Sequence, residues 1–139
     1  MDEIVNYKSV FKPSVTVFIL FEENEIYDEI KPLFDVYGYG FASVDENLVF
    51  LDGEIITSGD QIDEDVLRFI EAHEVSHILL NHSTERNDDD EMDADLGAYI
   101  LLSKEKLKNS VDILVENFEN RHGLKFKKSL LKRVQERIF

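Results

Sequence analysis

Short apolar runs separated by polar or glycine-containing breaks fill the N-terminal part of the chain. Residues 14–21 are rich in β-branched and aromatic side chains, which is typical of a strand. Residues 25–37 place apolar side chains at helical spacing and predict one helix. Residues 42–51 and 54–57 flank an Asp-Gly dipeptide, which favours a two-residue turn, so we expect two strands paired as a hairpin.

From residue 62 onward the apolar positions follow the helical period. We expect one long apolar helix from 62 to about 81, a polar loop, and a second helix from about 91 to 102. An apolar stripe predicts a third helix that ends at His122-Gly123, and residues 124–138 predict a basic amphipathic fourth. The predicted fold class is α+β, with a small antiparallel or mixed sheet in the N-terminal half packed on a helical C-terminal half.

The length of 139 residues predicts a single domain. Residues 1–60 would supply the strands and one helix, residues 61–103 the two helices that carry the candidate chemistry, and residues 104–139 the C-terminal helices. With 43% hydrophobic and 32% charged residues, the composition is that of a folded globular protein. The chain has no cysteine, which excludes a disulfide framework, a thiolate metal site and a cysteine nucleophile.

The sequence has no apolar run long enough to cross a bilayer. Residues 1–4 also lack the basic start and apolar run of a signal peptide. We therefore expect a cytoplasmic protein without a membrane-spanning segment.

Charge is distributed unevenly along the chain. Residues 1–103 carry five basic and 25 acidic side chains, whereas residues 104–139 carry ten basic and five acidic ones. An acidic body repels a phosphate backbone, which argues against direct nucleic-acid binding by the whole protein. The basic end could still touch nucleic acid, and the alternative is a solvated helix face beside the acidic body. Its cations are Lys125, Lys127, Lys128, Lys132, Arg133 and Arg137.

The first long helix contains the motif H-E-x-x-H. His73 and His77 are four residues apart, so both imidazoles can face one metal ion from one side of a helix. Glu74 projects about 100° further round, where a general base can take a proton from a water molecule beside the metal. The alternative is that both histidines are interior residues bonded to backbone or carboxylate groups. Three titratable groups in the middle of an otherwise apolar helix favour the metal site.

A third protein ligand must come from elsewhere in the chain. Glu91 is the first candidate, because the polar loop lets the second helix fold back against the first. Asp95 lies one turn later and could accept the N–H of a liganding histidine and so fix its tautomer. Glu91 could instead cap its helix, and Asp93, Asp95 or His82 remain alternative third ligands, although His82 lies well off the face of the motif.

The chain resembles the ImmA/IrrE family of zinc metallopeptidases. Residues 68–77, RFIEAHEVSH, followed by residues 91–102, EMDADLGAYILL, are similar to that family's R-F-x-x-A-H-E-x-x-H and E-x-x-A-[ND]-x-F-A-x-x-L-L. The likeness covers about 35 residues, in a short form without a helix-turn-helix segment. Ser76 stands where glycine is common, and Gly97 replaces the usual phenylalanine.

The resemblance implies a zincin-like fold and one Zn²⁺ per chain. His73, His77 and Glu91 would be the zinc ligands, Glu74 the catalytic base, and Asp95 the partner of a ligand. The implied activity is that of a zinc endopeptidase that cuts a specific cytoplasmic protein, with a helix-turn-helix transcriptional repressor as one candidate.

Related zinc peptidases bind substrate as an added strand along a sheet edge. By that analogy the segment Glu54, Ile55, Ile56 and Thr57 is the expected substrate cradle. Two rival hypotheses remain open. One is a weakly active or inactive zincin-fold binding module that acts through its acidic body and basic C-terminal helix, and the other is a metal-free relative in which Glu91 caps its helix.

Overall fold

A four-stranded mixed sheet forms the N-terminal part of the structure, a computed structural model that describes residues 4–83 and 85–138 apart from the side chain of Tyr37. The strands are ordered β1-β2-β4-β3, with β2 parallel to β4 and both outer pairs antiparallel. Residues 1–3, 84 and 139, which the predicted domain includes, lie outside the described residues. The elements in chain order are β1 (Val5–Lys8), β2 (Thr16–Leu20), α1 (Tyr27–Tyr37), β3 (Gly40–Ser43), β4 (Leu48–Asp52), α2 (Gly53–Ile56), β5 (Thr57–Ser58), β6 (Gln61–Ile62), α3 (Glu64–Leu79), α4 (Asp88–Lys104), α5 (Lys108–His122) and the 3₁₀ helix η1 (Lys128–Arg133).

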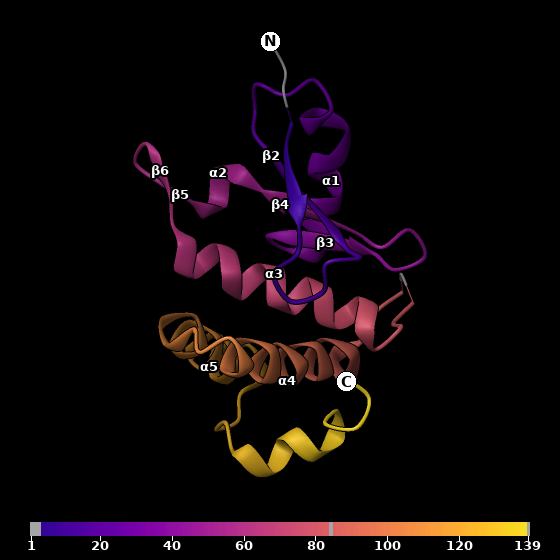
Figure 1. The fold of residues 1–139 in the computed structure, drawn as a ribbon, viewed down its shortest axis with the longest axis vertical. Coiled ribbons are helices and arrows are strands. Elements are labelled where there is room, and N and C mark those ends of the chain that lie inside the picture. Colours follow the sequence, from indigo (N-terminus) through magenta and orange to yellow (C-terminus); the bar gives the residue numbers. More distant parts are fainter. Residues whose placement is uncertain (1–3, 84, 139) are drawn as a thin grey trace.

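The helices pack on the sheet in layers. Figure 1 shows α3 beside the sheet, α4 and α5 on the other side of α3, and the C-terminal segment outside α4. Successive side chains of β2 point to opposite faces of the sheet. Val17 and Ile19 join the core around α3. Leu20 packs on the other face with Tyr27 and Phe34 of α1. The predicted α+β class is therefore confirmed, with a mixed sheet first in the chain and most of the helices after it.

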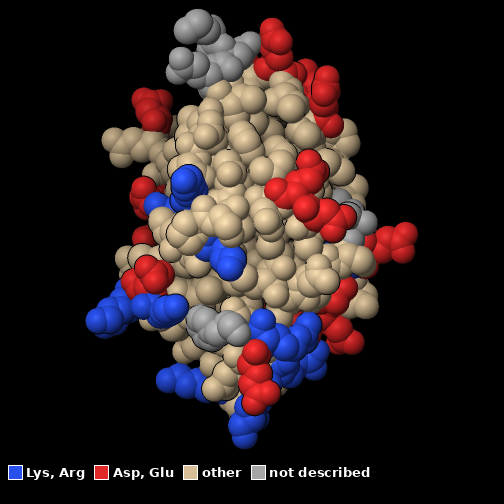
Figure 2. Space-filling view, turned by 45° about the vertical axis from the view of Figure 1, so that its right-hand side comes forward, with Lys and Arg blue, Asp and Glu red and all other residues tan. Residues whose placement is uncertain are grey.

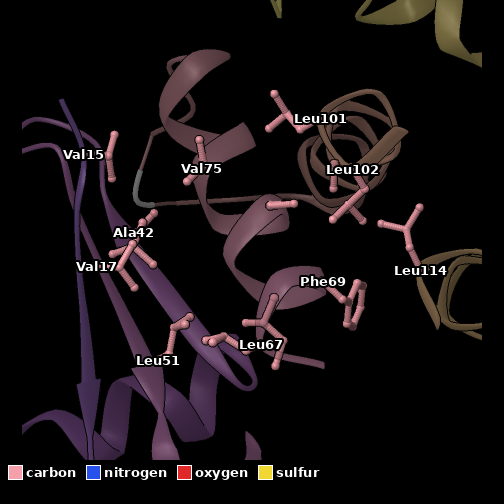
Figure 3. Close-up of a cluster of buried hydrophobic side chains, with 14 of the residues drawn as sticks. Val15, Val17, Ala42, Leu51, Leu67, Phe69, Val75, Leu101, Leu102 and Leu114 are labelled. Atoms are coloured by element: carbon pink, nitrogen blue, oxygen red, sulfur yellow. The ribbon is translucent and has the colours of Figure 1, made fainter. Parts of the chain in front are cut away.

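The long helix α3 is covered from two sides. In Figure 3, side chains of the sheet approach α3 from one side and those of α4 and α5 from the other, among them Val15, Val17, Ala42, Leu51, Leu101, Leu102 and Leu114. A polar side chain in the middle of this helix is shielded from water and needs a partner or a function.

The predicted strand at residues 54–57 is wrong. Glu54, Ile55 and Ile56 belong to the short helix α2, and only Thr57 enters a strand, β5, which pairs with β6 in a separate two-stranded sheet. The Asp52 side chain accepts a hydrogen bond from the Glu54 backbone N–H at 3.0 Å. This N-cap starts a helical turn where the Asp-Gly dipeptide predicted a hairpin.

The hairpin that does form joins β3 to β4, and its turn contains Asn47 with a positive φ of 55°. As a result β3, and not residues 54–57, is the sheet edge that packs beside α3. The substrate cradle predicted at residues 54–57 therefore loses its structural basis.

The C-terminal amphipathic helix predicted at 124–138 is also only partly formed. The structure has the six-residue η1 there, followed by turns. Like charges four residues apart, such as Lys128 and Lys132, disfavour a regular α-helix. The apolar side of the segment is nevertheless buried, with Val134 and Ile138 in the main core. None of the helices that the structure describes is both long and apolar enough to span a membrane.

Candidate metal centre

The middle of α3 holds a row of buried titratable side chains. Asp63 caps the helix by accepting hydrogen bonds from the Asp65 and Val66 N–H groups, which fixes where α3 begins. Two turns later the helix enters the core between the sheet and α4. The titratable residues buried there are Glu71, His73, Glu74 and His77.

Three side chains from two helices converge at one point. The Nε2 atoms of His73 and His77 lie 3.2 Å apart. Glu91 of α4 faces both, with Oε2 at 3.3 Å from His73 Nε2 and Oε1 at 3.2 Å from His77 Nε2. The structure thus brings together the three residues that the sequence predicts as metal ligands.

These donor atoms are spaced as zinc ligands are. Tetrahedral ligands at bond lengths of about 2.0–2.1 Å lie about 3.3 Å from one another. The separations of 3.2 and 3.3 Å among the two imidazole nitrogens and the Glu91 oxygens match that spacing. Glu91 also lines a cavity, so the group is open on one side. His73, His77 and Glu91 can therefore hold one metal ion.

Glu91 does not cap its helix. The N-cap of α4 is Asn87, whose side chain accepts from the Asp90 N–H at 2.8 Å while the Asp90 carboxylate accepts from the Asn87 N–H at 3.3 Å. This reciprocal pair leaves the Glu91 carboxylate to face the two histidines one turn into the helix. The capping alternative for Glu91 is therefore wrong.

Asp95 fixes the orientation of His73. Its Oδ1 lies 2.7 Å from His73 Nδ1, and its Oδ2 lies 2.8 Å from Nε2 of His122, at the end of α5. If His73 Nδ1–H donates to Asp95, Nε2 is left with its lone pair pointing at the ligand group. Only 1% of Asp95 is exposed, so the carboxylate bridges two imidazoles inside the protein.

His82 contacts His77 in the way that Asp95 contacts His73, through the Nδ1 atom of the ring. The Nδ1 atoms of the two rings lie 2.8 Å apart. A proton on His77 Nδ1 can be donated to His82 Nδ1, which again leaves Nε2 as the ligand atom. On the far side of His82, Nε2 faces Asp90 Oδ1 at 3.7 Å. The structure places His82 behind the candidate ligand His77, whereas the candidate third ligand Glu91 faces His77 Nε2.

Glu74 stands beside the ligand group and outside it. Its side chain is 4% exposed, and Oε1 has no hydrogen-bond partner among the described residues. Together with His73, Phe69 and Tyr39 it lines a small hollow of about 10 Å³, close to the room that one water molecule needs. Burial raises the pKa of the Glu74 carboxyl to about 7. A carboxylate with that pKa can both accept and return a proton near neutral pH.

The charges of the centre are arranged around a single cation position. Burial alone would lower the pKa of His73, but the charge of Asp95 and the bonds to Asp95 and Glu91 raise it to about 10. At His77 burial prevails and lowers the pKa to about 3. Burial opposes ionisation of Glu91, yet its hydrogen bonds to both histidines hold its pKa well below the usual range. One positive charge between Glu91 and Asp95 is therefore favoured, and either the His73 imidazolium or a metal ion supplies it.

Sequence reasoning missed two side chains at the edge of the centre. His122 binds Asp95, and the Nη1 atom of Arg121 lies 3.9 Å from Glu91 Oε2 and 4.0 Å from Asp95 Oδ2. Both come from the last turn of α5, which the sequence marked only as a helix end. Their partners Glu91 and Asp95 lie 26 or more positions earlier in the chain, where no local spacing links them. Only the packing of α5 on α4 could therefore reveal these contacts.

Glu71 was missed as well. It is fully buried on the side of α3 that faces β1, where the Tyr7 and Ser9 hydroxyls donate to it at 2.7 and 2.6 Å. Arg68 Nη1 at 2.6 Å and the Val10 backbone N–H at 3.1 Å also donate to Glu71. This network ties the N-terminal strand to the helix that carries His73 and Glu74. The Arg68–Glu71 spacing of three was the only local signal for it.

Comparisons with known proteins add no relative. No protein-family model matches the chain, and neither the curated proteins nor the solved structures include a significant match.

Proposed function

We propose that this protein is a zinc-dependent endopeptidase that hydrolyses a peptide bond in a specific protein. The observation that carries the proposal is the triangle of His73, His77 and Glu91 donor atoms with Glu74 beside it, whose buried Oε1 has no hydrogen-bond partner among the described residues. Zinc at that position would supply a Lewis acid that polarises a peptide carbonyl and makes water more acidic. The H-E-x-x-H sequence and its likeness to the ImmA/IrrE family support the same proposal. We include in the proposal that the core of the fold is zincin-like.

Three side chains that are not ligands would also have roles in this reaction. Glu74 accepts a proton from the attacking water and later returns it to the leaving amine. Asp95 and His82 keep the ligand imidazoles in one tautomer and one orientation. The resemblance also suggests a class of substrate: we propose a protein such as a helix-turn-helix transcriptional repressor.

The direct test replaces the proposed base. Glu74→Gln should leave zinc binding intact, because Glu74 is outside the ligand group, and should lower the cleavage rate by about 10²–10⁴-fold. Cleavage is measured by mass spectrometry of a proteome-derived peptide library and of intact lysate proteins incubated with the zinc-loaded protein. Glu64→Gln, on the exposed first turn of the same helix, is the matched control and should cleave at the wild-type rate.

Two results would contradict the proposal. Undiminished cleavage by Glu74→Gln would remove Glu74 from the mechanism. A wild-type protein that carries zinc but generates no new termini in either mixture would contradict peptidase activity itself.

A further inference from the structure

A cavity of about 670 Å³ opens against the metal centre. It lies between the end of α1, the loop that precedes α4 and the end of α5. Glu91 and His122 form part of its wall, so anything bound there is next to the candidate zinc position. The remaining charged residues of its lining are Arg86, Arg121, Asp35 and Asp88.

Arg121 is placed to receive a ligand. Its side chain is 36% exposed, and its separations of 3.9 and 4.0 Å from Glu91 and Asp95 are too long for hydrogen bonds. It also lines the small hollow beside Glu74, so it stands where the two openings meet. A guanidinium offers five N–H donors in a planar fork that matches a carboxylate.

Arg86 adds a second guanidinium to the same cavity. Its Nη2 donates to the Ala42 carbonyl of the edge strand β3 at 2.9 Å, which anchors the side chain. Arg86 and Arg121 both line the cavity, and its wall also includes Glu91. Both arginines therefore share this opening with the candidate metal ligand. Residues 1–103 contain only five basic side chains, and Arg86 is one of them.

The two aspartates of the lining are compensated from within the protein. Asp35 forms an ion pair with Lys31 at 3.1 Å. Asp88 stands in the first turn of α4, where the helix dipole stabilises negative charge. Arg121 and Arg86 are therefore the side chains of the lining that an anion would contact.

We propose that this cavity binds a carboxylate of the substrate, held by Arg121 with Arg86 beside it. The inference rests on the peptidase function proposed above and narrows its substrate class. The substrates are peptides with an aspartate or glutamate side chain, or a free C-terminal carboxylate, close to the cleaved bond.

Matched hydroxamate probes test this binding without any need for turnover. Each probe is a malonyl hydroxamate, which binds zinc, joined to a dipeptide. One pair carries Ala-Ala with a free C-terminus or a C-terminal amide, and the other carries amidated Asp-Ala or Asn-Ala. Dissociation constants are measured by calorimetry on the zinc-loaded full chain, and zinc content is measured for every variant.

At least one carboxylate probe should bind wild-type protein about tenfold or more tightly than its neutral partner, as expected for a charge-assisted hydrogen bond. The pair that shows the difference identifies whether the bound carboxylate belongs to a side chain or to the C-terminus of the peptide. Arg121→Gln should abolish the preference, measured within each pair as the ratio of the two dissociation constants. Arg121→Lys should retain part of the preference, and Arg86→Gln should reduce it. Arg137→Gln, which removes the same charge from the C-terminal segment, should have no effect.

Equal binding of both members of both pairs to wild-type protein would overturn the carboxylate site and leave the metal centre standing. A preference that survives both Arg121→Gln and Arg86→Gln would overturn the assignment to these arginines. If no probe binds and the protein takes up no zinc, the metal centre itself is refuted, and the proposed carboxylate site beside it is refuted as well.

Discussion

Asp95 is the residue on which the geometry of the centre depends most. Its two oxygens hold His73 and His122, and the charge of His73 and the bond to His122 overcome the effect of burial and lower its pKa to about 2. Asp95→Asn keeps the shape and removes the charge that makes His73 a strong ligand. We expect zinc affinity to fall by about 10–100-fold, measured by competition with a chelator.

Asp89→Asn is the control for this change, because Asp89 lies on the same helix with a largely exposed carboxylate. Zinc affinity equal to wild type in Asp95→Asn would show that His73 does not depend on Asp95.

A pH dependence follows from the same pair of residues. The pKa of His73 is raised from 6.5 to about 10 in the folded protein. The stability that its charged form contributes is therefore complete below pH 6.5 and is lost as the pH rises through 10. In chelator-treated protein, the free energy of unfolding should fall between pH 7 and 10, and urea titrations at several pH values measure this.

In zinc-loaded protein the free energy of unfolding should not show this fall between pH 7 and 10, because a His73 that binds zinc stays neutral throughout that range. Asp95→Asn should flatten the dependence in the chelator-treated protein. A metal-free wild type whose stability is constant from pH 7 to 10 would contradict the charged state assigned to His73.

Single residues also show where prediction from sequence succeeded. The relation of His73 to His77 is set by helical periodicity, and the loop length brought Glu91 within reach, so local rules were sufficient for the ligand group. His122, Arg121 and Tyr7 depend on how α5 and β1 pack against distant parts of the chain. Such long-range neighbours leave no periodic signal in one sequence.

At the scale of elements, α3 and α4 approach closely at two positions where the sequence differs from the ImmA/IrrE family pattern. A Cβ added to Gly97 would lie 2.8 Å from Ser76 Oγ and 2.7 Å from Ile138 Cδ1. The two departures, Ser76 and Gly97, therefore meet in one contact. The glycine lets α4 bring Glu91 and Asp95 to the histidines of α3.

Gly97→Ala should destabilise the protein by about 1–3 kcal/mol, because overpacking forces neighbouring side chains to move. The same substitution in a Ser76→Gly background should cost less, since one of the two obstructing side chains is gone. Urea unfolding of the four proteins in this double-mutant cycle gives the coupling. Additive effects would show that the two residues are not in contact.

Elements also show why some predictions failed. Helices α1, α3 and α4 were predicted with errors of a few residues at their ends, because long apolar patterns at helical spacing specify them. β1 was not predicted, since its four residues, VNYK, carry little apolar character. Residues 54–57 were assigned to a strand because the Asp-Gly dipeptide resembles a hairpin turn, whereas the Asp52 side chain caps α2 instead.

At the scale of the whole molecule, the basic end is joined to the acidic body. In Figure 2, Lys and Arg side chains gather at the end where Figure 1 places the C-terminal segment. Arg133 binds Asp93 of α4 at 2.9 Å, and Arg137 approaches the same carboxylate at 3.6 Å. These pairs lie two residues from both Glu91 and Asp95, on the side of α4 away from the centre. The segment thus supports α4, the helix that carries the candidate third ligand Glu91.

The layered packing of α3 and α4 brings together side chains that can hold one metal ion, and we propose that this ion is zinc. Native mass spectrometry during zinc titration tests this directly, with Glu91→Ala beside wild type and Asp89→Ala as the matched control from the same acidic turn. We predict one tightly bound zinc per chain in wild type and in Asp89→Ala, and its loss in Glu91→Ala. A wild-type protein that binds no zinc, or a Glu91→Ala variant that binds it as tightly as wild type, would contradict the account.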